Sequence, residues 1–132
     1  TEPKCIAVLD WEISTIGDPL ADFTYHLMQW RMPPGGTGGG TQSLANGDLP
    51  ALGIPTEAEY IKMYCDRTGR DGIENIDFYF AYNFFRIACI LQGIAGRVRD
   101  GTAASAHAAA NAANVAPMAK LGWLYAQKAG AV

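Results

Sequence analysis

The pattern of apolar and polar positions predicts one short strand followed by four helices. Residues 5–10, Cys-Ile-Ala-Val-Leu-Asp, form a short apolar run rich in strand formers, which is typical of a buried strand. A strand needs a partner, either from the turn-forming start of the chain or from sequence outside it. Helical periodicity or helix-end signals then mark four segments: 18–31, 55–69, 75–101 and 102–130.

Local signals predict where the first two helices begin and end. Asp18 is a good N-cap, and Pro19 follows at the first helical position, where proline is tolerated. Thr56 and Glu59 have the spacing of a capping box, and Gly69 is suited to end that helix.

The last two helices have different compositions. Segment 75–101 is apolar nearly all round, so we expect the central buried helix there, with its aromatic side chains in the core. Segment 102–130 is rich in alanine, which allows close packing. Thr102 can cap it, and Pro117 should kink or divide it.

Residues 33–53 form a long glycine-rich loop. A phosphate cradle is one reading, but the loop lacks both the Gly-Lys-Ser/Thr ending of a P-loop and the Gly-x-Gly-x-x-Gly order. A flexible surface loop is therefore the favoured interpretation.

Composition limits the class of protein. The 132 residues suffice for one domain at most, and 49% hydrophobic with 17% charged residues excludes a disordered chain. The net charge of −3 argues against a nucleic-acid partner. No apolar run reaches the length of a membrane span, so no membrane partner is expected. Cys5, Cys65 and Cys89 read as buried thiols of a reducing compartment, which predicts a cytoplasmic protein.

Charge is distributed unevenly, and the acidic part holds the candidate chemistry. Residues 1–60 contain two basic and eight acidic residues, whereas residues 61–132 contain eight basic and five acidic ones. Asp10 ends the apolar run and Glu12 follows, with no lysine or arginine nearby in the sequence. A carboxylate beside a buried segment needs a positive partner, and Mg²⁺ is often held by one or two carboxylates plus substrate phosphates. Capping of the next turn by Asp10 is the alternative, and both stay open.

Asp18, Asp22 and His26 are spaced to share one face of the first helix. Asp18 is explained as a cap and as a partner of the helix dipole. Asp22 lies between apolar neighbours, so we expect a buried carboxylate that accepts hydrogen bonds from the backbone of a neighbouring loop. His26 is more typical of a core histidine than of a ligand.

The segment Val-Leu-Asp-Trp-Glu-Ile-Ser-Thr-Ile-Gly-Asp-Pro-Leu-Ala-Asp resembles the part that follows the catalytic loop in the aminoglycoside phosphotransferase / choline kinase family. The resemblance is closest to the branch associated with acyl-CoA dehydrogenases. It implies a mainly α fold, namely the helical C-terminal subdomain of a protein-kinase-like α+β fold with one short strand or hairpin at its start. Residues 1–17 would be the strand and metal-binding turn, and residues 18–132 the helical lobe.

The resemblance also assigns roles. Asp10 stands where the family binds Mg²⁺, with Glu12 near the metal, directly or through water. Asp18 would fix the turn into the helix, and Asp22 would brace the catalytic loop. The implied activity is transfer of phosphate from ATP to a hydroxyl group of a small molecule, which makes the parent protein a small-molecule kinase.

The family's catalytic motif, His-Gly-Asp-x4-Asn, does not occur in this sequence. We therefore expect the catalytic residues upstream of Thr1, together with the nucleotide-binding lobe, and we expect these 132 residues to be an inactive fragment. Exposed apolar surface on such a lobe predicts a possible dimer. Two alternatives remain: a non-catalytic helical binding or interaction module, and, with less support, a hydrolase using Asp10 and Glu12 as acid and base.

Overall fold

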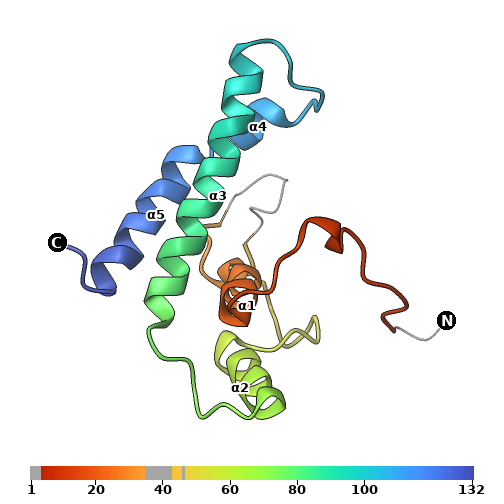
Figure 1. The fold of residues 1–132 in the computed structure, drawn as a ribbon, viewed down its shortest axis with the longest axis vertical. Helices are drawn as coiled ribbons and strands as arrows, with labels where there is room; N and C mark the ends of the chain where they lie inside the picture. The colour runs from red at the N-terminus through yellow and green to blue at the C-terminus, as the bar shows by residue number, and fades with distance from the viewer. Residues whose placement is uncertain (1–3, 35–42, 46) are drawn as a thin grey trace.

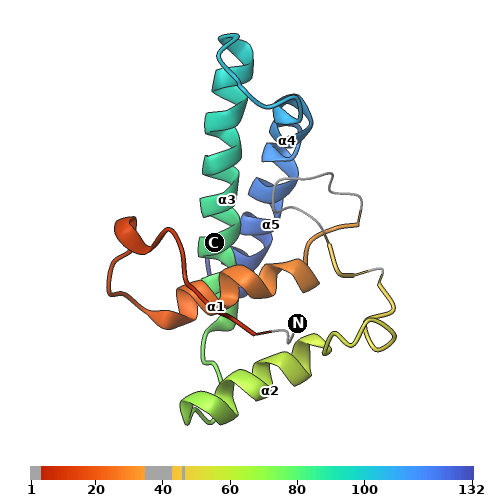
Figure 2. The same cartoon turned by 90° about the vertical axis from the view of Figure 1, so that its right-hand side faces the viewer.

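The computed structural model describes residues 4–34, 43–45 and 47–132, and its regular structure there is entirely helical. α3 forms the long axis with α5 beside it, while α1 and α2 lie toward its N-terminal end (Figure 1). Figure 2 shows α1 crossing α3. The α-helices are α1 (Pro19–Leu27), α2 (Glu57–Thr68), α3 (Ile76–Arg99), α4 (Ala108–Ala112) and α5 (Val115–Lys128), and the 3-10 helices are η1 (Trp11–Ile13) and η2 (Met28–Trp30).

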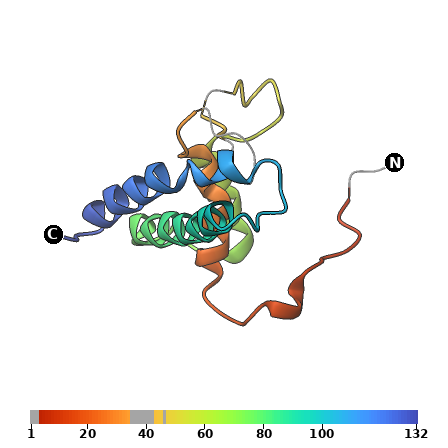
Figure 3. The same ribbon diagram turned by 90° about the horizontal axis from the view of Figure 1, so that it is seen from above.

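The mainly helical fold is confirmed, but the expected strand at residues 5–10 is wrong. Residues 4–9 have no regular secondary structure, and no strand occurs anywhere in the described residues. A strand requires a neighbour for its backbone hydrogen bonds, yet this segment projects away from the helices (Figure 3). Its apolar side chains therefore stay in solvent: Ile6 is 92% exposed and Leu9 is 81% exposed.

The predicted start of α1 and both predicted ends of α2 are confirmed. The helix predicted over 18–31 is shorter, because α1 ends at Leu27 and the 3-10 helix η2 follows it. Asp18 caps α1, because its Oδ1 accepts a hydrogen bond of 2.9 Å from the backbone N–H of Leu20. Thr56 and Glu59 form the reciprocal capping box of α2. Gly69 ends α2 with φ at +69°, in the left-handed region that glycine adopts without steric cost.

α3 is the core helix on one side only. Its inner face buries Phe80, Phe84, Ile87 and Leu91 against α1 and α5, and Met28, Met32 and Met118 complete the same cluster. The expectation that its aromatic side chains lie in the core holds for Phe80 and Phe84 but is wrong for Phe78, Tyr82 and Phe85, which are exposed. The reason is that helices pack against one face of α3 and leave the other to solvent.

The apolar outer face also changes the expectation about membranes. By length and composition alone, α3 could cross a bilayer, contrary to the expectation that no segment is long and apolar enough. Here it packs with α1, α4 and α5, and its buried residues form the centre of the hydrophobic core. A core helix of a soluble protein meets the same criterion.

The final segment divides as predicted for Pro117. This residue is the third of α5, and the chain between α4 and α5 passes through Ala113, four residues earlier. A proline ring clashes with the carbonyl group four positions before it, so the break falls there. Thr102 does not cap this segment. It binds the carbonyl oxygen of Arg97 instead, and so closes the end of α3.

α5 approaches α3 closely at a small residue. A Cβ atom at Gly122 would lie 3.3 Å from the backbone nitrogen of Phe85. Glycine is therefore favoured at this contact, which agrees with the close packing expected of this segment.

Two further expectations have different outcomes. The glycine-rich loop at 33–53 lies partly outside the described residues, since 35–42 and 46 are not among them. Of the cysteines, Cys65 is buried as expected, but Cys5 and Cys89 are exposed. Cys5 belongs to the segment that packs on nothing, and Cys89 lies on the outer face of α3.

Candidate functional site

The acidic turn, residues Asp10–Ser14, presents two exposed carboxylates ahead of α1. Asp10 has φ 58° and ψ 26°, a left-handed conformation that aspartate tolerates better than most residues, and η1 begins immediately after it. The backbone N–H and the hydroxyl of Ser14 both donate to the carbonyl oxygen of Trp11, at 3.0 and 2.6 Å. The turn is thus closed by its own hydrogen bonds.

This geometry corrects the argument made from the sequence. Asp10 was expected to end a strand, with Glu12 just after it, whereas a 3-10 turn carries both residues. Asp10 was also expected beside a buried strand, but both carboxylates are exposed. Neither carboxylate therefore needs a positive partner to offset burial.

The carboxylates of the acidic turn can supply part of a metal site. No group of three or more His, Cys, Asp or Glu side chains capable of holding a metal ion occurs among the described residues. Mg²⁺ nevertheless prefers oxygen ligands and often uses only one or two protein carboxylates, with waters and substrate phosphates as the remaining ligands. Asp10 and Glu12 fit that donor set.

Asp18 joins α1 to α3. Besides capping α1 through Oδ1, it accepts a hydrogen bond of 2.5 Å at Oδ2 from the hydroxyl of Tyr79. The Tyr79 hydrogen bond is the main reason that the pKa of Asp18 is lowered, with smaller contributions from the Leu20 N–H and from the charge of Arg70. The same bond raises the pKa of Tyr79. Asp18 therefore remains ionised and accepts both bonds.

Asn83 binds α1 one turn further along α3. It is fully buried, and its Nδ2 donates to the carbonyl oxygen of Ala21 at 2.9 Å and to Thr24 Oγ1 at 2.8 Å. Sequence reasoning missed both Tyr79 and Asn83, which lie about sixty residues from their partners in the chain. The polar Asn83 within an apolar helix was the available signal, because a buried amide needs partners.

Asp22 and His26 are both exposed on α1. The expectation that Asp22 is buried is wrong, and its carboxylate forms no hydrogen bond or ion pair within the described part of the chain. His26 is not a core histidine: its Nδ1 lies 3.0 Å from the hydroxyl of Tyr60 on α2, and its ring contacts Trp30. His26 thus belongs to the aromatic contact between α1 and α2.

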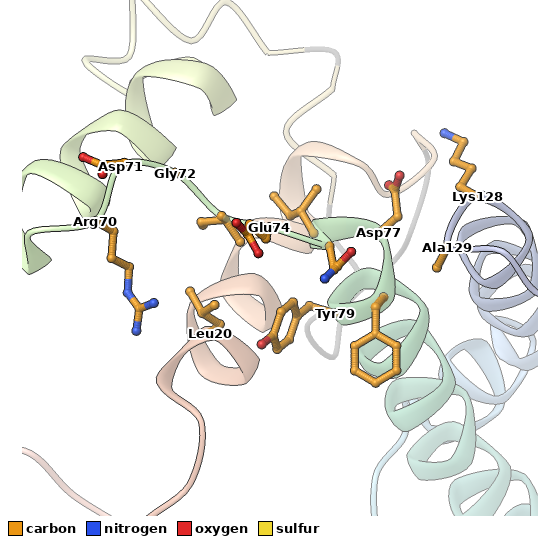
Figure 4. A pocket seen from close by; sticks show the side chains of 13 residues that line it. Leu20, Arg70, Asp71, Gly72, Glu74, Asp77, Tyr79, Lys128 and Ala129 are labelled. Atoms are coloured by element: carbon orange, nitrogen blue, oxygen red, sulfur yellow. The ribbon is translucent and has the colours of Figure 1, made fainter.

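A broad open cavity of about 1110 Å³ lies between the α2–α3 connection, the start of α3 and the end of α5. Figure 4 shows Arg70 and Tyr79 reaching toward the start of α1, where Leu20 lies. The charged side chains that line this cavity are Arg70, Asp71, Glu74, Asp77 and Lys128.

Comparison with known proteins places this geometry in a family. Residues 1–81, more than half of the chain, match the model of the phosphotransferase enzyme family. A crystal structure from Ralstonia eutropha JMP134, assigned as an aminoglycoside phosphotransferase, has 52% sequence identity and a TM-score of 0.83. The match covers 97% of this chain and 38% of that one.

Curated relatives are much longer than this chain. Acyl-CoA dehydrogenase family member 10 of Mus musculus is 42% identical over 127 residues, which is 96% of this chain and 12% of the relative. Acyl-CoA dehydrogenase family member 11 of the same organism is 36% identical over 125 residues, which is 92% of this chain and 15% of the relative. The resemblance inferred from the acidic turn is confirmed, and the chain belongs to the phosphotransferase enzyme family.

Proposed function

We propose that this chain supplies the metal-binding turn and helical lobe of an enzyme that transfers phosphate from ATP to a hydroxyl group of a small molecule. The observation that carries the proposal is the exposed acidic turn, within the residues that match the phosphotransferase family. Neither Asp10 nor Glu12 forms an ion pair with any described residue. Both carboxylates are therefore free to bind a cation.

The proposed division of labour follows from the chemistry. Phosphoryl transfer requires mainly accurate positioning and stabilisation of charge. Asp10 would hold Mg²⁺ directly, and Glu12 would hold it directly or through a water molecule. The bound ion would neutralise charge on the phosphates of ATP. Asp18 fixes the point at which the acidic turn enters α1, and Asp22, exposed on α1, is available to brace a catalytic loop.

We further propose that these 132 residues do not transfer phosphate by themselves. The family's His-Gly-Asp-x4-Asn motif is not in the sequence, and we expect that motif and the nucleotide-binding lobe upstream of Thr1. The solved relative, of which this chain covers 38%, is long enough to hold both. ATP turnover by the isolated 132-residue chain would contradict this part of the proposal.

We propose the open cavity beside the α2–α3 connection as the place where the acceptor binds. Its walls offer carboxylates at Asp71 and Glu74 and a guanidinium group at Arg70, which suit a ligand with several hydroxyl groups. A hydroxylated metabolite, such as a hydroxyacyl compound, is the substrate class that we favour. Replacement of Glu74 by Gln should raise KM for the acceptor and leave KM for ATP unchanged. An unchanged KM for the acceptor would mean that the acceptor binds elsewhere.

The decisive experiment measures ADP release by the longest natural chain that contains these residues, with ATP, Mg²⁺ and a panel of hydroxylated small molecules. The Asp10→Asn variant should lower kcat by about 100-fold or more, since it removes a charged metal ligand. Glu12→Gln should have a smaller effect. Asp66→Asn is the matched control, because Asp66 is an exposed carboxylate of α2 that pairs with Lys62.

The outcome separates the enzyme from its main alternative. Loss of activity in Asp10→Asn with normal activity in Asp66→Asn would support the kinase. A natural chain that releases no ADP with any acceptor would favour the non-catalytic helical binding or interaction module.

We also propose a cytoplasmic location and self-association through apolar surface. The three cysteines are free, which supports a reducing compartment.

The surface proposed for self-association includes Phe85 and Trp123. They are 66% and 54% exposed on the outer face of α3 and α5 and flank a shallow apolar groove. Size-exclusion chromatography with light scattering should show a dimer, and a monomer at all concentrations would contradict the association.

A further inference from the structure

Two polar side chains of α3 hold the first turns of α1, and neither belongs to the motif that identifies the family. Tyr79 donates to the carboxylate of Asp18, and Asn83 donates to the carbonyl oxygen of Ala21. Because residues four apart lie on one face of a helix, both reach the same side of α1. We call Tyr79 and Asn83 the α1 clasp.

The clasp lies where the acidic turn joins the helical lobe. Among the described residues, no hydrogen bond or ion pair connects residues 4–17 to any α-helix, and Ile16, two positions before Asp18, is fully exposed. Asp18 is the first described residue with such a connection, and it has one through each carboxylate oxygen. The Leu20 N–H and the Tyr79 hydroxyl therefore set the direction in which the chain from Asp10 enters α1.

The bond from Tyr79 differs from the cap in what it fixes. The Leu20 N–H belongs to α1 itself, so the cap orients Asp18 only relative to its own helix. Tyr79 belongs to α3, so its bond orients Asp18 relative to the lobe. The positive charge of Arg70, in the α2–α3 connection, also favours the ionised carboxylate of Asp18.

We infer that Tyr79 is a positioning residue for phosphoryl transfer, acting through Asp18 on the placement of the metal-binding carboxylates. This inference rests on the proposed function. Asn83 is buried and contributes chiefly to folding, whereas the Tyr79–Asp18 pair is at the surface and contributes little to stability. Loss of the Tyr79 hydroxyl should accordingly disturb catalysis more than folding.

The test compares Tyr79→Phe with Tyr82→Phe in the longest natural chain. Tyr82 is the matched control: it lies three residues further along α3, is 47% exposed and has no hydrogen bond among the described residues. Tyr79→Phe should raise the Mg²⁺ concentration for half-maximal rate, or lower kcat, by roughly tenfold, as expected when a supporting partner of a metal site is removed. KM for the acceptor and the melting temperature should change little, and Tyr82→Phe should match the wild type.

A double variant checks that the effect passes through Asp18. The double variant Asp18→Asn, Tyr79→Phe should lose no more activity than the more damaging of the two single variants, because both changes break the same interaction. Additive losses, or identical Mg²⁺ dependence in Tyr79→Phe and Tyr82→Phe, would overturn the inference.

Hydrogen–deuterium exchange tests the α1 clasp independently of the proposed function. Tyr79→Phe should speed exchange at residues 14–21 and leave α5 unchanged, and equal exchange in the two proteins would overturn the clasp even in an active kinase. If the wild-type chain transfers no phosphate, the proposed function fails, and faster exchange at 14–21 would then support the positioning of the turn alone.

Discussion

Residues 4–17 and α3 both carry strings of large apolar side chains, yet these side chains meet opposite environments. Val8 and Leu9 are 73% and 81% exposed, whereas Phe80 and Phe84 are fully buried. The difference does not lie in hydrophobicity. α3 satisfies its backbone internally and can turn one face toward α1 and α5, while an extended segment needs a neighbouring strand before it can bury anything.

The same contrast occurs within α3, between consecutive residues. Phe84 lies in the core and contacts Tyr125 at a ring distance of 5.5 Å, but Phe85 is 66% exposed. One step along a helix turns a side chain by about 100°. Apolar sequence therefore marks what can be buried, and the packing partner decides what is.

The largest expected effect would test this contrast directly. Phe84→Ala should lower the free energy of unfolding by about 3–5 kcal/mol, through lost burial and the cavity left behind. Phe85→Ala should cost less than about 1 kcal/mol in a monomer. Urea denaturation monitored by circular dichroism measures both. Similar losses in the two variants would mean that the outer face of α3 is covered in solution.

A partly buried ion pair, Arg31 with Glu57, can be compared with an exposed one, Lys62 with Asp66. The guanidinium of Arg31 lies 2.6 Å from Glu57 and 4.3 Å from the centre of the Phe80 ring. Burial acts to lower its pKa, but hydrogen bonds with Tyr125 and Glu57 outweigh burial and raise it.

Arg31→Met should cost about 1–3 kcal/mol of unfolding free energy, because it leaves partly buried acceptors without a donor. Lys62→Met removes an exposed pair with Asp66 and should cost only about 0.3–0.5 kcal/mol. Thermal unfolding at low and moderate salt measures both losses. A larger loss in Lys62→Met than in Arg31→Met would contradict the assigned role of Arg31.

The lowered pKa of Asp18 predicts a small dependence of stability on pH. The pKa of Asp18 is lowered in the folded protein, so its ionised form stabilises the fold above the unfolded-state pKa, near 3.8. This contribution is lost as the pH falls through the lower folded-state pKa.

Asp18→Asn should therefore destabilise the protein at pH 6, and the difference from the wild type should shrink in strong acid. Asp22→Asn, which removes an exposed carboxylate without a hydrogen-bond partner in the described residues, should show a weaker pH dependence. Melting temperatures from pH 2 to 7 would measure both, and a pH-independent difference for Asp18→Asn would argue against the bond to Tyr79.

The smallest expected effect belongs to the acidic turn. Asp10→Asn keeps a residue that tolerates the left-handed conformation and removes only an exposed charge. Its unfolding free energy should stay within about 0.5 kcal/mol of the wild type. A loss above about 2 kcal/mol would show that the turn packs against the helical lobe.

Much of the fold could be read from local chemistry. Asp18, the pair Thr56 and Glu59, and Gly69 marked helix ends correctly, because caps satisfy backbone groups within a few residues of themselves. Pro117 located the division of the last segment because a proline ring clashes with the carbonyl group only four residues before it. The acidic turn was recognisable because its carboxylates and the following helix start form one short motif.

The amino-acid sequence by itself determined that the chain is mainly helical, where α1 starts, where α2 starts and ends, and which family the chain belongs to. Tertiary structure alone decided that residues 5–10 form no strand here, that Asp22 is exposed, and that Tyr79 and Asn83 hold α1. These features join groups up to about sixty residues apart or depend on a packing surface. No local pattern specifies which distant donor meets a carboxylate, since that meeting is fixed only when helices pack.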